Sequence, residues 1–354
     1  MISRAHLSAL LPLLLAACST PAPQAPPPAA IQVVDAAGQA LALGGPPARV
    51  VAAGKGLYMP VHVFAMFPGA LGRLAAVEAR GDATSFISQL DPGPDGWVDL
   101  AHDPGVEAIA ALHPDLVLAK GTVEDEHSTT LARVGIPTLH LGLETPERFL
   151  QDVALLGQVL GEPARAEAIS AFYSQRLERI AAAVGPLAEA ARPRVLVLGM
   201  HARGGKIAVK VPAKAWMQTQ QVALAGGRPV WLEEATVTDG WTIVGFEQIA
   251  AWDPDVLVVC IPHDMEEAAV MADLASDERW GHLQAVQNDR LLRFPHDLYD
   301  WNSPDPRWLL GLIWLAGQLH PRSPPEAGHG RRAARLLRRI VWDRARAGGR
   351  LDPA

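Results

Sequence analysis

The chain has few of the features that mark disulfide-bonded, nucleic-acid-binding or membrane-spanning proteins. Only two cysteines occur in 354 residues, and because Cys18 closes a predicted leader, Cys260 has no partner for an intramolecular disulfide. Acidic residues outnumber basic ones, 38 to 31, so no general positive field exists to attract nucleic acid. Beyond the N-terminus there is no run of 18 apolar residues, which argues against a transmembrane helix.

Lysine is also scarce, with only five copies at positions 55, 120, 206, 210 and 214. All five fall in or shortly after loops that follow predicted strands. Positive charges at strand ends favour an anionic ligand. The alternative is that loops are polar in general and that arginine replaces lysine elsewhere because of base composition. Cys260 ends an apolar run and is predicted to be a buried, inert thiol.

The N-terminus is typical of a bacterial lipoprotein signal. Arg4 supplies a positive start, Leu7–Leu15 a short apolar core, and Leu15-Ala-Ala-Cys18 its end. We expect Cys18 to be lipidated, with an ordinary signal peptide and an incidental cysteine as the alternative. Residues 19–30 are rich in proline and alanine and should form an extended tether. The expected location is the periplasm or cell surface, with a lipid anchor in a bacterial membrane.

A ten-residue pattern occurs twice, 140 positions apart. VEAIAALHPD at 106–115 returns as FEQIAAWDPD at 246–255, with six identical residues, and an apolar run follows each copy. This spacing predicts a helix and the strand after it in each half of the chain, at Glu107–Leu112 with Leu116–Ala119 and at Glu247–Trp252 with Val256–Cys260.

Further apolar runs complete an alternation of strands and helices. The additional predicted strands are Arg49–Ala53, Pro137–Leu141, Arg194–Leu198 and Arg290–Phe294. The pattern predicts an α/β fold of two lobes, each with a parallel β-sheet flanked by helices, joined by a long interlobe helix that is interrupted at Gly161-Glu-Pro163. The expected divisions are a signal peptide at 1–18, a tether at 19–30, an N-terminal lobe at 31–145, a helical connector at 146–185, a C-terminal lobe at 186–325 and a basic helix or tail at 326–354.

Ligands of such sheets bind beyond the carboxyl ends of the strands. The polar residues expected there are Lys55 and Tyr58 after the first strand, Lys120 after the first repeat, and His201 with Lys206 at the start of the second half. Three tryptophans near the predicted lobe edges, Trp97, Trp241 and Trp301, together with Tyr299, would suit a large, partly planar or apolar ligand. His201 and His296 lack close metal-ligand spacing, so no dedicated site for a bare metal is predicted.

The repeated glutamates have a geometric consequence. Each repeat helix runs antiparallel to its strand, so its first turn lies at the same sheet edge as the ligand loops. Glu107 and Glu247 are therefore expected at the mouth of the site, one on each lobe. Helix-dipole complementation explains a single acidic residue in a first turn, but it explains less well why both copies keep glutamate.

The order of these motifs resembles the periplasmic solute-binding proteins of iron–siderophore, heme and cobalamin importers, the class with a helical backbone between the lobes. The motifs that carry the resemblance are 34–51, both repeats, 155–161, 225–227 and 280–290, and together they span about 31–321.

This resemblance implies binding without catalysis, no cofactor, and a monomer. The protein would capture a metal chelate between its lobes and deliver it to an ABC permease powered by an ATPase. It further implies that Glu107 and Glu247 pair with arginines of the permease, that Trp241 is a pocket aromatic, and that Tyr299 and Trp301 lie in a ligand-contacting loop. An oxyanion receptor for molybdate or tungstate is the main alternative and a bare-metal receptor a lesser one. Nitrogenase-like and hydrolase functions are disfavoured for want of cluster cysteines and a nucleophile elbow.

Overall fold

The computed structural model describes residues 30–79, 97–122, 126–203, 206–233, 240–262, 265–296 and 300–321, and the statements below refer to these residues. The predicted signal peptide, nearly all of the tether, and the basic tail lie outside them. So do Cys18 and Tyr299.

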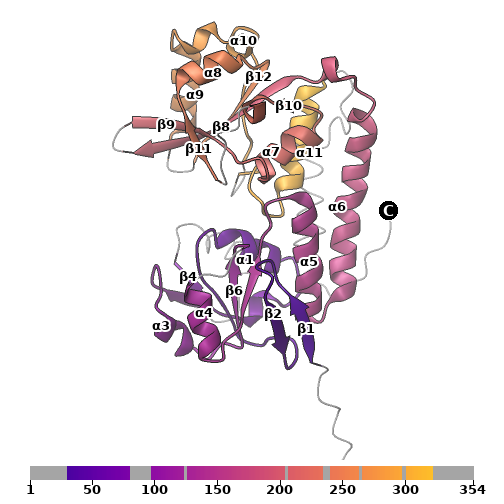
Figure 1. Ribbon diagram of the computed structural model, residues 1–354, viewed down its shortest axis with the longest axis vertical. Helices are drawn as coiled ribbons and strands as arrows, with labels where there is room; N and C mark the ends of the chain where they lie inside the picture. Colours follow the sequence, from indigo (N-terminus) through magenta and orange to yellow (C-terminus); the bar gives the residue numbers. More distant parts are fainter. Residues whose placement is uncertain are drawn as a thin grey trace, which may run out of the picture.

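Two α/β lobes lie one above the other, with helices running along one side of both (Figure 1). In the N-terminal lobe a five-stranded sheet has the order β5-β4-β3-β6-β7, and every neighbouring pair is parallel. Its strands are β3 (Val50–Ala52), β4 (Leu74–Glu78), β5 (Val98–Leu100), β6 (Leu116–Lys120) and β7 (Thr138–Leu141). The other elements of this lobe are the antiparallel hairpin β1 (Ile31–Val34) and β2 (Ala40–Leu43), α1 (Tyr58–Phe64), η1 (Leu71–Arg73), α3 (Val106–Ala110) and α4 (Glu126–Arg133).

The connector between the lobes consists of two packed helices, α5 (Pro146–Leu160) and α6 (Pro163–Val184). Thr145 caps α5 by accepting a hydrogen bond from the backbone N–H of Arg148 at 3.1 Å. The helix ends at Gly161, whose φ of 73° is a left-handed conformation that favours glycine. The interruption predicted at this position is confirmed, and α6 runs beside both lobes (Figure 1).

The C-terminal lobe contains a mixed sheet, which differs from the prediction of a parallel sheet in each half. Its order is β11-β9-β8-β12-β13, with β10 also beside β8; β9 is antiparallel to both β8 and β11. Because β8 and β9 are antiparallel neighbours, the chain reverses between them, where a parallel connection was expected. The strands are β8 (Arg194–Arg203), β9 (Lys206–Val211), β10 (Arg228–Pro229), β11 (Thr242–Val244), β12 (Val256–Cys260) and β13 (Leu291–Arg293). The helical elements are η2 (Glu189–Ala191), α7 (Met217–Leu224), η3 (Val230–Glu233), α8 (Phe246–Trp252), α9 (Glu267–Ser276), η4 (Trp280–His282), α10 (Gln284–Gln287) and α11 (Trp308–Leu319).

One large apolar core runs through both lobes and the helices beside them. Three aromatic rings of this core pack against one another. The ring centres of Phe149 (α5) and Tyr173 (α6) are 5.1 Å apart, and those of Tyr173 and Trp308 (α11) are 5.4 Å apart. The Tyr173 hydroxyl also donates a hydrogen bond to the carbonyl of Pro306 at 2.6 Å. A smaller core lies beneath α3 and α4. Burial of this continuous apolar surface is the main force holding the lobes to the connector.

Candidate functional site: the interlobe cavity and the paired glutamates

A cavity of about 400 Å³ lies between the two lobes. Both lobes contribute to its walls, mainly through residues at or just beyond the carboxyl ends of strands, as expected for parallel α/β sheets. From the N-terminal lobe it is lined by Tyr58, Met59, Lys120 and Glu144. From the C-terminal lobe and the segment before α11 it is lined by Gly199, Met200, Lys210, Trp216, Gln218, Trp241, Cys260, Pro262, Asp300, Asn302, Ser303 and Pro304.

Two tryptophans form the aromatic wall of this cavity. The Trp216 and Trp241 rings meet edge to face, 5.6 Å apart at an interplanar angle of 84°. Trp241 lies directly over Gly199 of β8, where an added Cβ would come within 2.8 Å of the ring. The glycine therefore allows the ring to lie against the strand, and any larger residue would push it away from its present position.

The two lysines of the cavity differ in their surroundings. The Lys120 ammonium forms an ion pair with the Glu144 carboxylate, so its charge is locally compensated. The Lys210 ammonium lies 5.0 Å from the centre of the Trp241 ring, and among the described residues no carboxylate pairs with it. Burial lowers the pKa of Lys210 from its ordinary value of 10.5, because desolvation disfavours the charged amine. Lys210 is thus the uncompensated cation of the described cavity wall.

The floor of the cavity is formed where the segment before α11 crosses to α1. The Tyr58 hydroxyl lies 3.2 Å from the Ser303 hydroxyl, and burial raises the pKa of the Tyr58 phenol, which keeps it neutral. Beneath it, His62 Nδ1 lies 3.1 Å from Asp305 Oδ2, with both side chains fully buried. Burial disfavours ionisation of Asp305, but the Arg307 guanidinium and His62 outweigh it and hold the pKa of the carboxyl below its ordinary value.

Three of the predicted ligand-contacting residues, Tyr58, Lys120 and Trp241, line the cavity together. Others lie elsewhere. Lys55 is exposed and lines a separate cavity of about 260 Å³ in the N-terminal lobe. Trp97 is half-buried against the large core.

The remaining predicted residues do not line the cavity, or their side chains lie outside the described part of the structure. His201 is exposed on β8. Trp301 is half-buried against the large core, and its carbonyl accepts a hydrogen bond from the Gln221 amide. Lys206 begins β9, but its side chain is outside the described part of the structure, as is Tyr299. Sequence reasoning missed Lys210 and Trp216, although the alternating pattern of Lys206–Val211 is typical of a strand and would have placed Lys210 near the site.

Cys260 is buried, as predicted, and burial raises the pKa of its thiol well above the ordinary value. Within the described residues there is no cluster of three or more histidine, cysteine or acidic side chains that could hold a metal ion. The same part of the chain has no helix of the length and apolarity needed to cross a membrane.

The repeated glutamates occupy equivalent positions in the two lobes. Glu107 is in the first turn of α3 and Glu247 in the first turn of α8, and both are exposed. Each helix begins after a glycine, Gly105 or Gly245, with extended backbone and no side-chain cap. An added Cβ on those glycines would lie 3.2 Å and 3.1 Å from the respective Glu Oε2. Each carboxylate therefore folds back over the start of its own helix, where the backbone N–H groups favour negative charge.

Two other residues shared by the repeats, the isoleucine and the aspartate, have structural explanations. Ile109 and Ile249 are fully buried core residues. The Asp115 carboxylate accepts the backbone N–H groups of Ala48 and Arg49, both at 2.9 Å, at the start of β3.

The second repeat makes the equivalent link. The Asp255 carboxylate accepts the N–H of Arg194, at the start of β8, at 2.7 Å. In both lobes the side chain of this arginine also donates a hydrogen bond to a backbone carbonyl near the end of the repeat helix. Arg49 donates to Leu112, and Arg194 donates to Trp252. This shared link, the Arg–Asp clasp, attaches each repeat helix to the first strand of its lobe. Packing and the clasp thus explain the isoleucine and the aspartate, whereas the exposed glutamates form no such link.

The arrangement defines a two-lobe solute-binding protein whose cavity lies between lobes joined by helices. Residues 97–298, more than half of the chain, match the family described as periplasmic binding protein. The chain therefore belongs to the periplasmic binding protein family.

Comparison with a solved structure supports the fold assignment. The periplasmic binding protein MolA of Haemophilus influenzae, solved with molybdate bound, superposes with a TM-score of 0.71 over 91% of this chain and 99% of that chain, at 16% sequence identity. At this identity the likeness establishes the shared two-lobe fold and does not bear on the ligand.

Sequence relatives have different named ligands. A cobalamin-binding protein of Halobacterium salinarum is 28% identical over 224 residues, which cover 61% of this chain and 56% of that protein. The iron-uptake system-binding protein of Bacillus subtilis is 23% identical over 216 residues, or 60% of this chain and 62% of that protein. The aligned part of the chain thus spans little more than half the length of the cobalamin-binding relative.

Proposed function

We propose that the protein is the solute-binding component of an ABC importer, that it binds a metal chelate in the interlobe cavity, and that it delivers this ligand to a membrane permease without chemical conversion. The observation that carries the proposal is the cavity wall of Trp216, Trp241 and Lys210. Aromatic rings bind planar or apolar parts of a ligand, and the uncompensated ammonium binds its negative charge.

The size and chemistry of the wall favour a chelate over a bare oxyanion. A tetrahedral oxyanion is small and is held by hydrogen-bond donors alone. This cavity of about 400 Å³ has polar side chains as well, but two indole rings and two methionines form much of its wall, and these suit the apolar part of a larger ligand. Chelates of the siderophore, cobalamin and heme types all combine an organic framework with polar or charged groups. The names of two relatives, a cobalamin-binding and an iron-uptake protein, are compatible with this class, whereas the name of a third, a molybdate-binding protein, is compatible with the oxyanion alternative.

Delivery requires a surface that a permease recognises in both lobes. Glu107 and Glu247 provide two exposed carboxylates at equivalent helix starts, and the repeated isoleucine and aspartate already have structural roles. We infer that the two glutamates pair with basic residues of the permease. Lipidation of Cys18 and the Pro/Ala tether would keep the protein in the periplasm or at the cell surface, close to that permease.

The direct test is to purify the full-length protein from its own cell and to identify its bound ligand by native mass spectrometry and absorption spectroscopy. A coloured organic chelate that leaves on unfolding is the expected result. A colourless molybdate or tungstate adduct would contradict the chelate assignment but keep the transport role, and conversion of an added chelate into a covalently altered product would contradict the transport role itself. As a control for adventitious adsorption, Trp241→Ala protein should carry less of the same ligand.

A further inference from the structure

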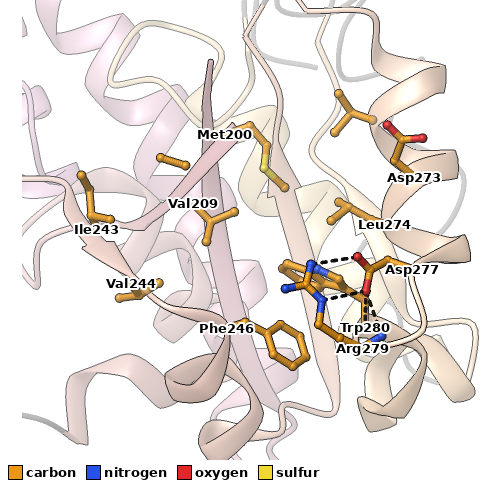
Figure 2. Close-up of a pocket in the computed structure, with 12 residues that line it drawn as sticks. Met200, Val209, Ile243, Val244, Phe246, Asp273, Leu274, Asp277, Arg279 and Trp280 are labelled. Atoms are coloured by element: carbon orange, nitrogen blue, oxygen red, sulfur yellow. Dashed lines mark hydrogen bonds and ion pairs between the residues drawn. The ribbon is translucent and has the colours of Figure 1, made fainter. Parts of the chain in front are cut away.

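An apolar groove of about 360 Å³ lies in the C-terminal lobe, separate from the ligand cavity (Figure 2). One side is formed by Val209 of β9 with Ile243 and Val244 of β11, and the other by Leu274 of α9 and Trp280. Most of the lining side chains are apolar. A groove of this kind on the surface of a protein suits the side chains of a partner better than it suits water.

The exposure of Ile243 is unusual for a residue of its type. Its side chain is 73% exposed, more than any other large apolar side chain of the described residues. It lies on β11, which is the edge strand of the described C-terminal sheet. Exposed apolar edge strands promote aggregation, and native proteins usually protect them. Coverage by a partner provides such protection.

The groove is continuous with the position of Glu247. Phe246, the residue before this glutamate, lines the groove, and the Arg279 guanidinium lies 5.4 Å from its ring centre. Arg279 is held by Asp277, with NH2 2.9 Å from Oδ2, as the dashed lines in Figure 2 show. Glu247 also attracts the Arg279 guanidinium. Among the described residues here, the carboxylates of Asp273, Asp277 and Glu247 outnumber this one arginine, so the described rim of the groove is negative. A complementary partner is therefore basic beside an apolar side chain.

The described cavity beside α3 in the N-terminal lobe has a lining of mixed character. Charged and polar side chains such as Lys55, Asp103 and His127 lie there beside Ile109 and Val117. The two glutamates thus lie in similar helix starts but in different surroundings.

We propose that this groove is a docking site for the ABC permease, into which a periplasm-facing segment of the permease inserts an apolar side chain while a neighbouring basic residue pairs with Glu247. The proposal rests on the proposed transport function. Docking would then combine an electrostatic contact at the glutamate of each lobe with one apolar contact, which only the C-terminal lobe provides. Met200 lines both the groove and the ligand cavity, so an inserted side chain would lie one residue away from the ligand.

The test is photo-crosslinking of the full-length lipoprotein in its own cells. Three variants of the protein each carry one p-benzoylphenylalanine. It replaces Ile243 in the groove, the exposed Ala108 beside Glu107, or Val134. Val134 is a matched control because it is 58% exposed and follows α4. It lies near the amino ends of the strands of the N-terminal sheet, whereas Glu107 lies near their carboxyl ends. The expected result is that Ile243 and Ala108 crosslink to an integral membrane protein identified by mass spectrometry as an ABC permease subunit, and that Val134 does not.

The outcomes separate this inference from the function on which it rests. Crosslinking from Ala108 alone would overturn the groove as a docking site and leave permease docking through the glutamates intact. Crosslinking from neither position would overturn the proposed docking face as a whole. An adduct between Ile243 and a second copy of this chain would assign the groove to self-association and also overturn the inference.

A charge substitution gives a second, independent measurement. In the chain that carries the crosslinker at Ala108, Ile243→Asp should lower the yield of the permease adduct roughly tenfold or more, as expected for loss of an apolar anchor. Val134→Asp should leave the yield unchanged. Since Ile243 is largely exposed, both variants should fold, which circular dichroism and thermal unfolding would verify. An unchanged adduct yield in folded Ile243→Asp protein would refute the proposal.

Discussion

The two copies of the repeat have the same packing and hydrogen bonds, but the surfaces around them differ. In both lobes a buried isoleucine and the Arg–Asp clasp fix the helix to the first strand, and in both a glutamate lies over a glycine at the helix start. Around Glu247 there is an apolar groove and a paired arginine, whereas the cavity beside α3 in the N-terminal lobe has polar and charged side chains among its apolar ones. The shared features build the lobes, and the features that differ are on the surface, where a partner can distinguish one lobe from the other.

Reversal of both docking charges should have the largest effect. In the Glu107→Lys, Glu247→Lys double variant, ligand uptake by whole cells should be lost, because two like-charge contacts replace two attractive ones. The affinity of the purified protein for its ligand should stay the same, since neither residue lines the cavity. The Glu167→Lys, Glu178→Lys double variant, at two exposed positions of α6, is the control for the same change in net charge. A large loss of ligand affinity in the double variant would argue against the docking role.

The two lobes contribute unequally to the wall of the ligand cavity, because both of its tryptophans come from the C-terminal lobe. Tryptophan substitutions in the two lobes test this difference. Trp241→Ala in the C-terminal lobe should weaken ligand binding by roughly tenfold to a hundredfold, as is typical of a central aromatic contact. Trp97→Ala in the N-terminal lobe should leave the affinity unchanged, because Trp97 packs against the core and does not line the cavity. Calorimetric titration with the identified ligand measures both. A Trp241 variant that loses thermal stability but keeps its affinity would assign Trp241 to packing.

Substitution of the clasp aspartates tests whether the shared part of the repeat is structural. Asp115→Ala and Asp255→Ala should each lower the free energy of unfolding by about 1–3 kcal/mol, because backbone N–H groups lose their acceptor. The loss should be larger for Asp255, whose bond to Arg194 is partly buried and shielded from water. Glu107→Ala should change stability by no more than about 0.5 kcal/mol. Urea unfolding of the ligand-free protein gives these values, and equal losses for Asp115 and Glu107 would contradict the division of roles.

The smallest expected effect concerns the two cavity lysines, of which only Lys210 lacks a described carboxylate partner. An anionic ligand binds the protonated amine, and burial has lowered the pKa of Lys210. Affinity should therefore decline as the pH rises through this lowered pKa, on the acid side of 10.5, by a few-fold to tenfold. Lys210→Met should bind more weakly at neutral pH and show no such decline. A decline that persists in this variant would assign the titration to another group.

Much of the fold could be predicted because its signals are local. The strand Val256–Cys260 is a continuous apolar run with the predicted limits, and Gly161 ends α5 where the helical pattern breaks. The mixed C-terminal sheet was missed, since an antiparallel hairpin between β8 and β9 depends on the pairing of two strands and not on either run alone.

The cavity was predicted less completely for the same reason. Tyr58 and Lys120 could be placed at the correct sheet edge because they come after predicted strands, whereas Trp241, which precedes β11, was predicted from the family resemblance. Trp216 comes to the wall through its packing against Trp241 over Gly199, a contact that no sequence spacing encodes. Trp301 follows a strand as well, but its carbonyl binds Gln221 and its ring packs against the core.

The buried contact between His62 and Asp305 joins residues 243 positions apart in the chain. Contacts of such long range form late, because the intervening chain must be closed into a loop before they can stabilise anything. The floor of the ligand cavity is therefore complete only when the segment before α11 has been synthesised. Until that segment has been made, the chain lacks the buried partner of His62, and with it the finished floor of the ligand cavity.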